Sequence, residues 1–293
     1  MKIYDCFLYC NEDVVLDIRL NVLDKFVDQF VIVESQFYHN GEYKGLNFNK
    51  NKFSKFKSKI NYIPIYTRPK NLDFSKDPEK KIDIKIMNAI KYENNQRNNV
   101  LRGLKKCNEE DIVILSDIDE IPNLESVKFK NIENKVIFFN QNYFYYKLNL
   151  HCPKQKWAGS RAIKYKNLKS PQWLRNLKVK KYPFWRIDKF FDKMIYRDFY
   201  IIKRGGWHFS YLNNSRGILR KLRTYLHYTD FEKKNINEKF VQNFINKKKP
   251  IYNLNSDQKG SKLNSQIKLK KINLKYLPVY VMENRNKFKN WLI

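Results

Sequence analysis

The chain has 293 residues, of which 42% are hydrophobic and 16% aromatic, enough for one large core or two smaller ones. This composition excludes a disordered chain. No apolar run reaches the roughly 18 to 20 residues of a membrane-spanning helix, and the N-terminus lacks the basic and apolar segments of a secretory signal. We therefore expect a cytoplasmic protein without a transmembrane helix, whose four cysteines are free thiols.

The formal net charge is +30, but the positive charge is concentrated in the second half of the chain. Residues 1–150 contain 24 Lys and Arg against 21 Asp and Glu, whereas residues 151–293 contain 35 against 8. Such a half could face nucleic acid, an acidic glycan or the anionic inner face of a membrane. An AT-rich genome could equally produce this abundance of Lys and Asn, and lysine blocks are by default solvated surfaces.

The first half of the chain alternates strands with helices. Four apolar or β-branched runs predict strands, at residues 2–10, 30–34, 60–66 and 111–117. Helices are predicted between them at residues 12–26, with Asn11 as N-cap, and at about residues 79–106. Strands that are continuously apolar indicate a parallel sheet covered on both faces.

After residue 135 the pattern changes to strands with little helix between them. Strands are predicted at residues 136–150, 160–165, 198–203 and 207–212, and helices near residues 215–228, 237–247 and 277–291. We therefore expect an α/β fold in which a mostly parallel central sheet is flanked by helices, with a strand and helix region at the C-terminal end.

Three carboxylates, Asp117, Asp119 and Glu120, follow the predicted strand at residues 111–117. In an open parallel sheet, ligands bind beyond the carboxyl ends of the strands. Residues i and i+2 of extended backbone point to the same side, so Asp117 and Asp119 can converge. Two convergent carboxylates with open coordination positions suit Mg²⁺ or Mn²⁺ bound to a substrate diphosphate.

Three other interpretations compete with a metal site. An Asp after a strand often caps the next helix, and a lone DxD is common by chance. An EF-hand loop starting at Asp117 fails, because Pro122 stands where the turn needs Gly and Lys128 where a bidentate Glu belongs. An aspartyl-phosphate phosphatase would use Asp117 as nucleophile and Asp119 as acid/base. In such phosphatases the motif usually lies at the beginning of the domain, whereas here two strand-helix units precede it.

Several segments resemble, in order, glycosyltransferase family 17, the bisecting-type β-1,4-N-acetylglucosaminyltransferases. They are residues 4–35, 44–53, 93–104, 111–122, 205–212 and 276–284. SDIDEIP and GGWHFSYL are the most specific of them, and the match is looser between about residues 123 and 200. The resemblance implies a GT-A, Rossmann-like fold, with a nucleotide-sugar-binding half at residues 1–134 and an acceptor-binding half at residues 135–293 of one catalytic domain.

The resemblance also implies a metal-dependent, inverting transfer of N-acetylglucosamine or a related sugar from a UDP-sugar to a glycan or lipid-linked saccharide, forming a β-linkage. Asp117 and Asp119 look like the family's DxD. Asp119 ranks first as a direct ligand of Mn²⁺ or Mg²⁺, and Asp117 lies nearer the ribose and the metal's waters. His208 is implied to complete the metal shell. The alternative is a purely structural histidine in the core beside Trp207 and Phe209.

Five further residues are implied as contacts of the UDP-sugar: Glu12, Glu34, Arg97, Lys221 and His227. Glu12 and Glu34 follow the first two strands, where this fold usually holds the base and ribose. Stabilisation of a helix N-terminus explains Glu12 equally well, and a loop salt bridge explains Glu34. Arg97 could meet the diphosphate or be solvated, and Lys221 and His227 could contact phosphate or acceptor.

Inversion needs a base that removes the proton of the acceptor hydroxyl. The second half of the chain offers only eight carboxylates. Of these, Asp188, Asp192 and Asp198 precede the His208 strand and are the candidates, and Glu120 is the competitor from the first half.

Two features of the second half suggest partners. Four tryptophans could stack on sugar rings or simply belong to the core: Trp157, Trp173, Trp185 and Trp207. The basic surface could hold the enzyme at an anionic membrane or bind an acidic acceptor. A nucleic-acid-binding protein is the alternative class, but no GxxG clamp, zinc knuckle or aromatic RNA-binding signature is present, so no nucleic-acid partner is expected.

Overall fold

The computed structural model describes residues 1–75, 77, 79–178, 198–226, 228–232, 236–251 and 267–293. Its strands are β1 (Ile3–Leu8), β2 (Gln29–Ser35), β3 (Ile60–Ile65), β4 (Ile112–Asp117), β5 (Glu120–Pro122), β6 (Val136–Tyr145), β7 (Leu150–Lys164), β8 (Phe199–Ile202), β9 (Gly206–Ser210) and β10 (Lys270–Lys271). Its α-helices are α1 (Asp13–Leu23), α2 (Lys81–Asn98), α3 (Val100–Gly103), α4 (Pro171–Asn176), α5 (Ser215–Thr224), α6 (Thr229–Glu232), α7 (Glu238–Asn246) and α8 (Val279–Glu283). Short 3₁₀ helices are η1 (Lys50–Phe56), η2 (Phe129–Asn131), η3 (Tyr165–Asn167), η5 (Leu274–Tyr276) and η6 (Lys289–Trp291).

The strands form one mixed sheet in the order β3, β2, β1, β4, β7, β6, β9, β5, with β8 beside β6 and β10 beside β7. β3, β2, β1 and β4 are parallel, whereas β7 is antiparallel to both β4 and β6. The α/β class is therefore confirmed, but the expectation of a mostly parallel sheet is only partly right. The order reverses between β1 and β4, because the chain runs outward through β2 and β3 before it returns beside β1.

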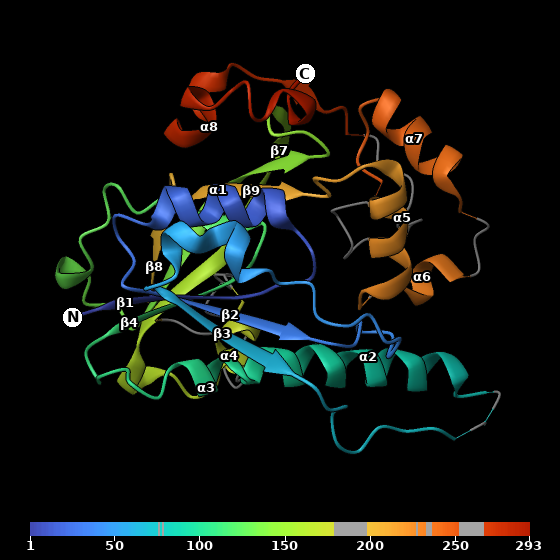
Figure 1. Ribbon diagram of the computed structural model, residues 1–293, viewed down its shortest axis with the longest axis horizontal. Helices are drawn as coiled ribbons and strands as arrows, with labels where there is room; N and C mark the ends of the chain where they lie inside the picture. The colour runs from blue at the N-terminus through green and yellow to red at the C-terminus, as the bar shows by residue number, and fades with distance from the viewer. Residues whose placement is uncertain (76, 78, 179–197, 227, 233–235, 252–266) are drawn as a thin grey trace, which may run out of the picture.

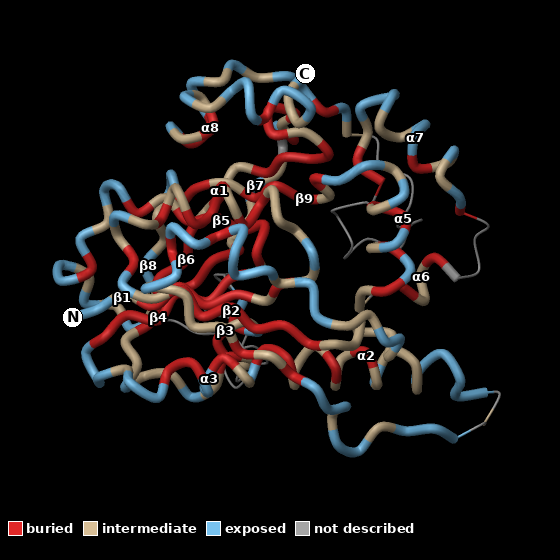
Figure 2. The backbone as a smooth tube through the Cα atoms, in the orientation of Figure 1, coloured by how far each residue is buried: buried red, intermediate tan, exposed pale blue. Residues whose placement is uncertain are grey.

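Each face of the parallel strands is apolar because a helical layer covers it. Ile112 and Ile114 of β4 belong to the cluster beneath α1, while Val113 and Leu115 belong to the cluster on the opposite face. Figure 1 shows α1 on one face of these strands and α2, α3 and α4 on the other, and Figure 2 shows the strands buried between them. Continuous apolar runs are therefore what this part of the sheet requires.

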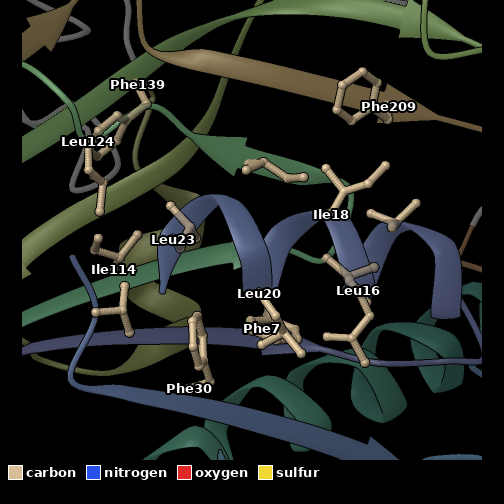
Figure 3. Packing of buried hydrophobic residues seen from close by; sticks show 14 of the residues in the cluster. Phe7, Leu16, Ile18, Leu20, Leu23, Phe30, Ile114, Leu124, Phe139 and Phe209 are labelled. Carbon is tan, nitrogen blue, oxygen red and sulfur yellow. The ribbon is translucent and has the colours of Figure 1, made fainter. Parts of the chain in front are cut away.

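Helix α1 is fixed to the sheet by its apolar side. Figure 3 shows Leu16 and Leu20 of α1 on the side of the helix that faces Phe7 of β1 and Phe30 of β2, and these four side chains and that of Leu23 are fully buried. Burial of each such side chain stabilises the fold by about 1.5 to 3 kcal/mol. This packing determines where the helix begins, and so where the residues before it lie.

Four element boundaries differ from the sequence-based expectation. Asn11 adopts a left-handed backbone conformation (φ 70°) and is not the N-cap, because α1 begins at Asp13. The long predicted helix ends at Asn98 and continues as the separate short helix α3. β7 begins at Leu150, well before the predicted strand, because its first part has no continuous apolar run and is held by pairing with β6. α8 is also shorter than predicted.

The pairing of β4 with β7 carries the sheet across residue 134, the expected boundary between two halves. The two halves therefore share one sheet. Among the helices of the described residues, none combines the length and the apolar character that crossing a membrane requires.

Candidate active site

A pocket of about 610 Å³ lies where the carboxyl ends of β1 and β4 meet the second half of the chain. Its volume falls within the range of small-molecule sites, roughly 300 to 1,000 Å³. Leu8 and Asp117, which end the two strands, are paired across the sheet and both line the pocket. Figure 1 shows α5 and α6 beyond the ends of β2 and β3, and Lys221 of α5 and Phe231 of α6 line the opposite wall. The pocket therefore occupies the position where open α/β sheets bind ligands.

The turn over residues 117–120 brings distant parts of the sequence together. The backbone N–H of Asp117 donates to Glu120 Oε2 at 2.9 Å and closes the turn. β5 then pairs Glu120 with His208 of β9, and the N–H of Phe209 donates to the carbonyl of Asp119 at 2.8 Å. Strand pairing thus places the SDIDEIP and GGWHFSYL motifs side by side.

Asp119 and His208 face each other in this pocket. His208 Nε2 lies 3.5 Å from Asp119 Oδ1, and Lys221 Nζ lies 3.3 Å from Asp119 Oδ2. Burial alone would raise the pKa of Asp119, but Lys221 and His208 hold it well below its usual value. The pKa of Lys221 is raised, because Asp119 and Glu12 outweigh the effect of burial. Asp119 is therefore an ionised carboxylate at neutral pH.

Asp117 points to two arginines. Its Oδ1 accepts from Arg97 of α2 at 3.1 Å and its Oδ2 from Arg175 of α4 at 2.6 Å. Burial opposes ionisation, but these guanidinium groups lower the pKa of Asp117. Both oxygens are thus engaged by cations, which argues against Asp117 as the free nucleophile of a phosphatase.

Glu120 is fully buried and has donors on both oxygens. Oε1 accepts from Trp157 Nε1 at 2.5 Å and from Arg175 at 2.9 Å. Oε2 accepts from Arg175 at 2.8 Å and from the N–H of Asp117. A carboxylate engaged in this way orients Arg175 and Trp157 and is poorly suited to accept a proton from a substrate.

The acidic side chains and His208 of the pocket are the groups that could hold a divalent cation. Within the described part of the chain, no three His, Cys, Asp or Glu side chains are grouped so that they could hold a metal ion by themselves. The expected set of Asp117, Asp119 and His208 is therefore not assembled there, because Asp117 faces the arginines. Asp119 and His208 do form a pair of carboxylate and imidazole ligands. Mg²⁺ and Mn²⁺ often take one or two protein ligands and complete their shell with substrate phosphates and water.

Glu12 follows β1 in the chain and lines the same pocket. Its Oε1 accepts from the Tyr225 hydroxyl and its Oε2 from the N–H of Cys10, both at 2.8 Å. Burial raises the pKa of Glu12, although Lys221 and Tyr225 oppose the increase. Glu12 makes no side-chain cap bond to α1, so the helix-cap alternative does not describe it.

Glu34 lies outside the pocket lining and holds a loop instead. Its carboxylate is fully buried and accepts from Lys44 Nζ at 2.7 Å, from the Tyr62 hydroxyl at 2.9 Å and from the N–H of Phe48 at 3.0 Å. Lys44, in contrast, does line the pocket. The loop salt bridge is therefore the interpretation that the structure favours for Glu34.

Of the two predicted bases that the structure describes, Glu120 lines the pocket and Asp198 does not. Asp198 precedes β8, which pairs with the start of β6, whereas Tyr143 near the end of β6 lines the pocket. The side chain of Asp198 accepts a hydrogen bond from Asn134 at 2.9 Å, at the end of β6 away from Tyr143. Three other predicted residues lie outside the described residues: Asp188, Asp192 and His227.

The tryptophans separate by position. Trp157 lines the pocket beside His208, with ring centres 5.2 Å apart. Trp207 donates to the carbonyl of Tyr276 at 2.7 Å, and Trp173 lies at the edge of the core beneath β4. Trp185 lies outside the described residues. Only Trp157 of the three described is therefore placed to meet a sugar.

Sequence reasoning missed several residues of the site. Arg175 lies in the segment that matches the family loosely, and no motif surrounds it. Tyr211 and Tyr225 line the pocket, and Lys221 Nζ lies 5.6 Å and 5.0 Å from their ring centres. Tyr211 follows His208 closely in GGWHFSYL and has a left-handed backbone (φ 53°), which is rare for a bulky residue. The position of Tyr211 in that motif is the sequence feature that could have identified it as a site residue.

Two comparisons with known proteins bear on this pocket. A search of curated proteins found no match. The sequence model of the protein family called glycosyltransferase family 17 matches residues 1–293. The match therefore includes both walls of the pocket, with the turn that carries Asp117 and Asp119 and the strand that carries His208. The chain belongs to glycosyltransferase family 17.

Proposed function

We propose that this glycosyltransferase transfers N-acetylglucosamine or a related sugar from a UDP-sugar to a saccharide acceptor, with inversion and with the help of Mn²⁺ or Mg²⁺. The observation that carries the proposal is the pair of Asp119 and His208, 3.5 Å apart, in a pocket of about 610 Å³ at the sheet position that binds ligands. The sugar, the uridine and the β-linkage are what the family resemblance implies for this pocket.

The charge of the pocket supports metal dependence. Its described lining contains five acids and four cations, which are Glu12, Glu93, Asp117, Asp119 and Glu120, and Lys44, Arg97, Arg175 and Lys221. Each of these cations is already within 4 Å of a carboxylate. The described lining therefore offers a diphosphate no unpaired cation. A divalent cation at Asp119 and His208 would neutralise the charge that develops on the departing diphosphate.

The residues around this pair have separate roles in the proposed mechanism. Asp119 and His208 would hold the cation, and the Lys221 ammonium beside Asp119 can donate to a phosphate oxygen. Arg97 and Arg175 fix the orientation of Asp117 and so the shape of the turn. Binding and orientation of the diphosphate therefore depend on both halves of the chain.

The two ends of the pocket suit different parts of the reactants. Backbone and side chains after β1, with Glu12 among them, form the wall where this fold usually holds the nucleoside. The opposite wall is rich in aromatic side chains from the second half: Tyr143, Tyr145, Trp157, Tyr211, Tyr228 and Phe231. Aromatic faces suit the apolar faces of sugar rings. We place the transferred sugar and the acceptor there.

The first experiment measures thermal unfolding of the full chain with UDP, with and without Mn²⁺. We expect stabilisation only when both are present, because a ligand at 100 times its Kd adds about 2.7 kcal/mol to the free energy of unfolding. Asp119→Asn should abolish the effect. Glu110→Gln, at an exposed acid paired with Lys164 outside the pocket, is the control and should leave it unchanged.

A second measurement tests the reaction. Purified protein is screened with sugar nucleotides for metal-dependent release of UDP, with UDP-N-acetylglucosamine as the expected substrate and Asp119→Asn as the blank. Stabilisation by oligonucleotides with a steep salt dependence, and none by UDP with Mn²⁺, would instead support the nucleic-acid-binding alternative.

A further inference from the structure

Arg19 of α1 forms a buried ion pair beneath the floor of the pocket. Its Nη2 and Nε donate to the two carboxylate oxygens of Asp5 of β1, at 2.6 and 2.7 Å. Both side chains have no exposed surface. The guanidinium also lies over the ring of Phe7, 4.5 Å from its centre. Such a pair is retained in a core only when further hydrogen bonds satisfy the remaining donors.

The remaining donors of Arg19 go to the turn that carries the two aspartates. Nη1 donates to the carbonyl of Glu120 at 2.7 Å, to that of Asp117 at 3.1 Å and to that of Ile118 at 3.2 Å. Three of the four carbonyls of residues 117–120 therefore point to one guanidinium nitrogen. The fourth, that of Asp119, accepts from the N–H of Phe209 of β9. Every carbonyl of the turn thus has a protein donor.

This arrangement fixes which way the side chains of the turn face. Because the carbonyls of residues 117, 118 and 120 are directed into the core, the Asp119 carboxylate is left on the pocket side, where it meets His208 and Lys221. Asp117 itself is held from the pocket side by Arg97 and Arg175. The turn is therefore held on both sides. Arg19 donates to the carbonyls of residues 117, 118 and 120, and the Ser160 hydroxyl shares the carbonyl of Glu120 with it, at 2.9 Å.

We propose that Arg19 is a positioning residue for metal and donor binding, which acts by holding the carbonyls of residues 117, 118 and 120 so that Asp119 faces His208. The proposal rests on the proposed function, because it assigns Arg19 a part in that same site. Arg19 touches neither the pocket nor a substrate. Groups that orient metal ligands typically contribute about 10- to 100-fold to metal affinity.

The test uses Arg19→Lys in the full chain. Lysine keeps the positive charge beside Asp5, so the ion pair and the fold are retained, but one ammonium cannot serve both Asp5 and three carbonyls. We expect the Kd for UDP at saturating Mn²⁺ to rise, and the Mn²⁺ concentration needed for half-maximal UDP binding to rise about 10- to 100-fold. Mn²⁺ binding without nucleotide, followed by electron paramagnetic resonance, should weaken by the same factor.

A matched control separates positioning from general destabilisation. Leu23→Ala removes a fully buried side chain from the same helix, one turn beyond Arg19 and away from the turn at residues 117–120. It should lower the midpoint of urea unfolding without changing Mn²⁺ or UDP affinity. If Arg19→Lys behaves like Leu23→Ala, Arg19 is only structural and the proposal is overturned.

A second variant covers the case in which Arg19→Lys does not fold. Asp5→Leu with Arg19→Met replaces the ion pair by apolar side chains of similar size, a change that is often neutral for stability. It should fold and still lose Mn²⁺ affinity, and wild-type affinity in this variant would also overturn the proposal. If wild-type protein itself binds neither Mn²⁺ nor UDP, it is the proposed function that fails, and the role of Arg19 falls with it.

Discussion

Replacement of Arg175 by Met should destabilise the protein strongly, because it leaves Glu120 charged in the core. The side chain of Arg175 is 14% exposed and that of Glu120 only 1%. The change removes two hydrogen bonds to Glu120, one to Asp117 and one to the carbonyl of Gly159. Loss of one partner of a buried pair costs about 3 to 5 kcal/mol. Since Glu120 keeps the donors of Trp157 and of the Asp117 N–H, we expect about 3 kcal/mol.

Urea unfolding followed by tryptophan fluorescence measures this cost, with the free energy taken by linear extrapolation. The double variant Arg175→Met with Glu120→Gln removes the unpaired charge and should recover more than 1 kcal/mol, a coupling that independent sites do not show. Lys164→Met breaks an exposed pair with Glu110 at a similar distance of 2.7 Å and should cost less than about 1 kcal/mol. If Arg175→Met costs no more than Lys164→Met, the pair is effectively solvated and the reasoning is refuted.

Three further predictions concern stability and sugar transfer. The lowered pKa of Asp117 means that its stabilising contribution is present above the ordinary Asp value of about 3.9 and is lost as the pH falls through the lower folded value. Asp117→Asn should therefore show a flatter loss of stability below about pH 4 in acid titrations of urea unfolding. Gly159→Ala should cost about 1 to 3 kcal/mol by the same assay, because a Cβ there would lie 2.6 Å from Glu120 Cδ. Asp188→Asn and Asp192→Asn, measured separately, should show one variant that loses sugar transfer and keeps metal-dependent UDP binding; loss of neither would exclude both as the base.

The parallel half of the fold could be predicted from sequence because both of its faces are covered. Four apolar runs separated by helices leave few arrangements, and the structure contains a strand at each of them. β7 could not be predicted over its full length, because residues 150–159 contain no continuous apolar run, include Pro153 and Gly159, and are held by pairing with β6. Its antiparallel direction follows from contacts between distant residues, which a local pattern does not contain.

The site could be predicted where a motif marks it and not where distant partners define it. The spacing of Asp117 and Asp119 and the resemblance around His208 pointed to the residues that the structure brings to one pocket. The orientation of Asp117 toward two arginines could not be predicted, because Arg175 comes from a helix with no recognisable motif. Arg19 resembled any solvated arginine on an amphipathic helix, yet it is fully buried.

The charge distribution bears on the choice between a transferase and a nucleic-acid-binding protein. Several lysines of the basic second half are exposed outside the pocket lining: Lys247, Lys248, Lys268, Lys270 and Lys271. The pocket cations, in contrast, are paired with carboxylates. An anionic membrane or polymer attracted by the exposed lysines would therefore bind apart from UDP. Binding of this membrane or polymer should weaken steeply as the salt concentration rises. It should not compete with binding of UDP and Mn²⁺, because the two kinds of ligand contact different cationic side chains.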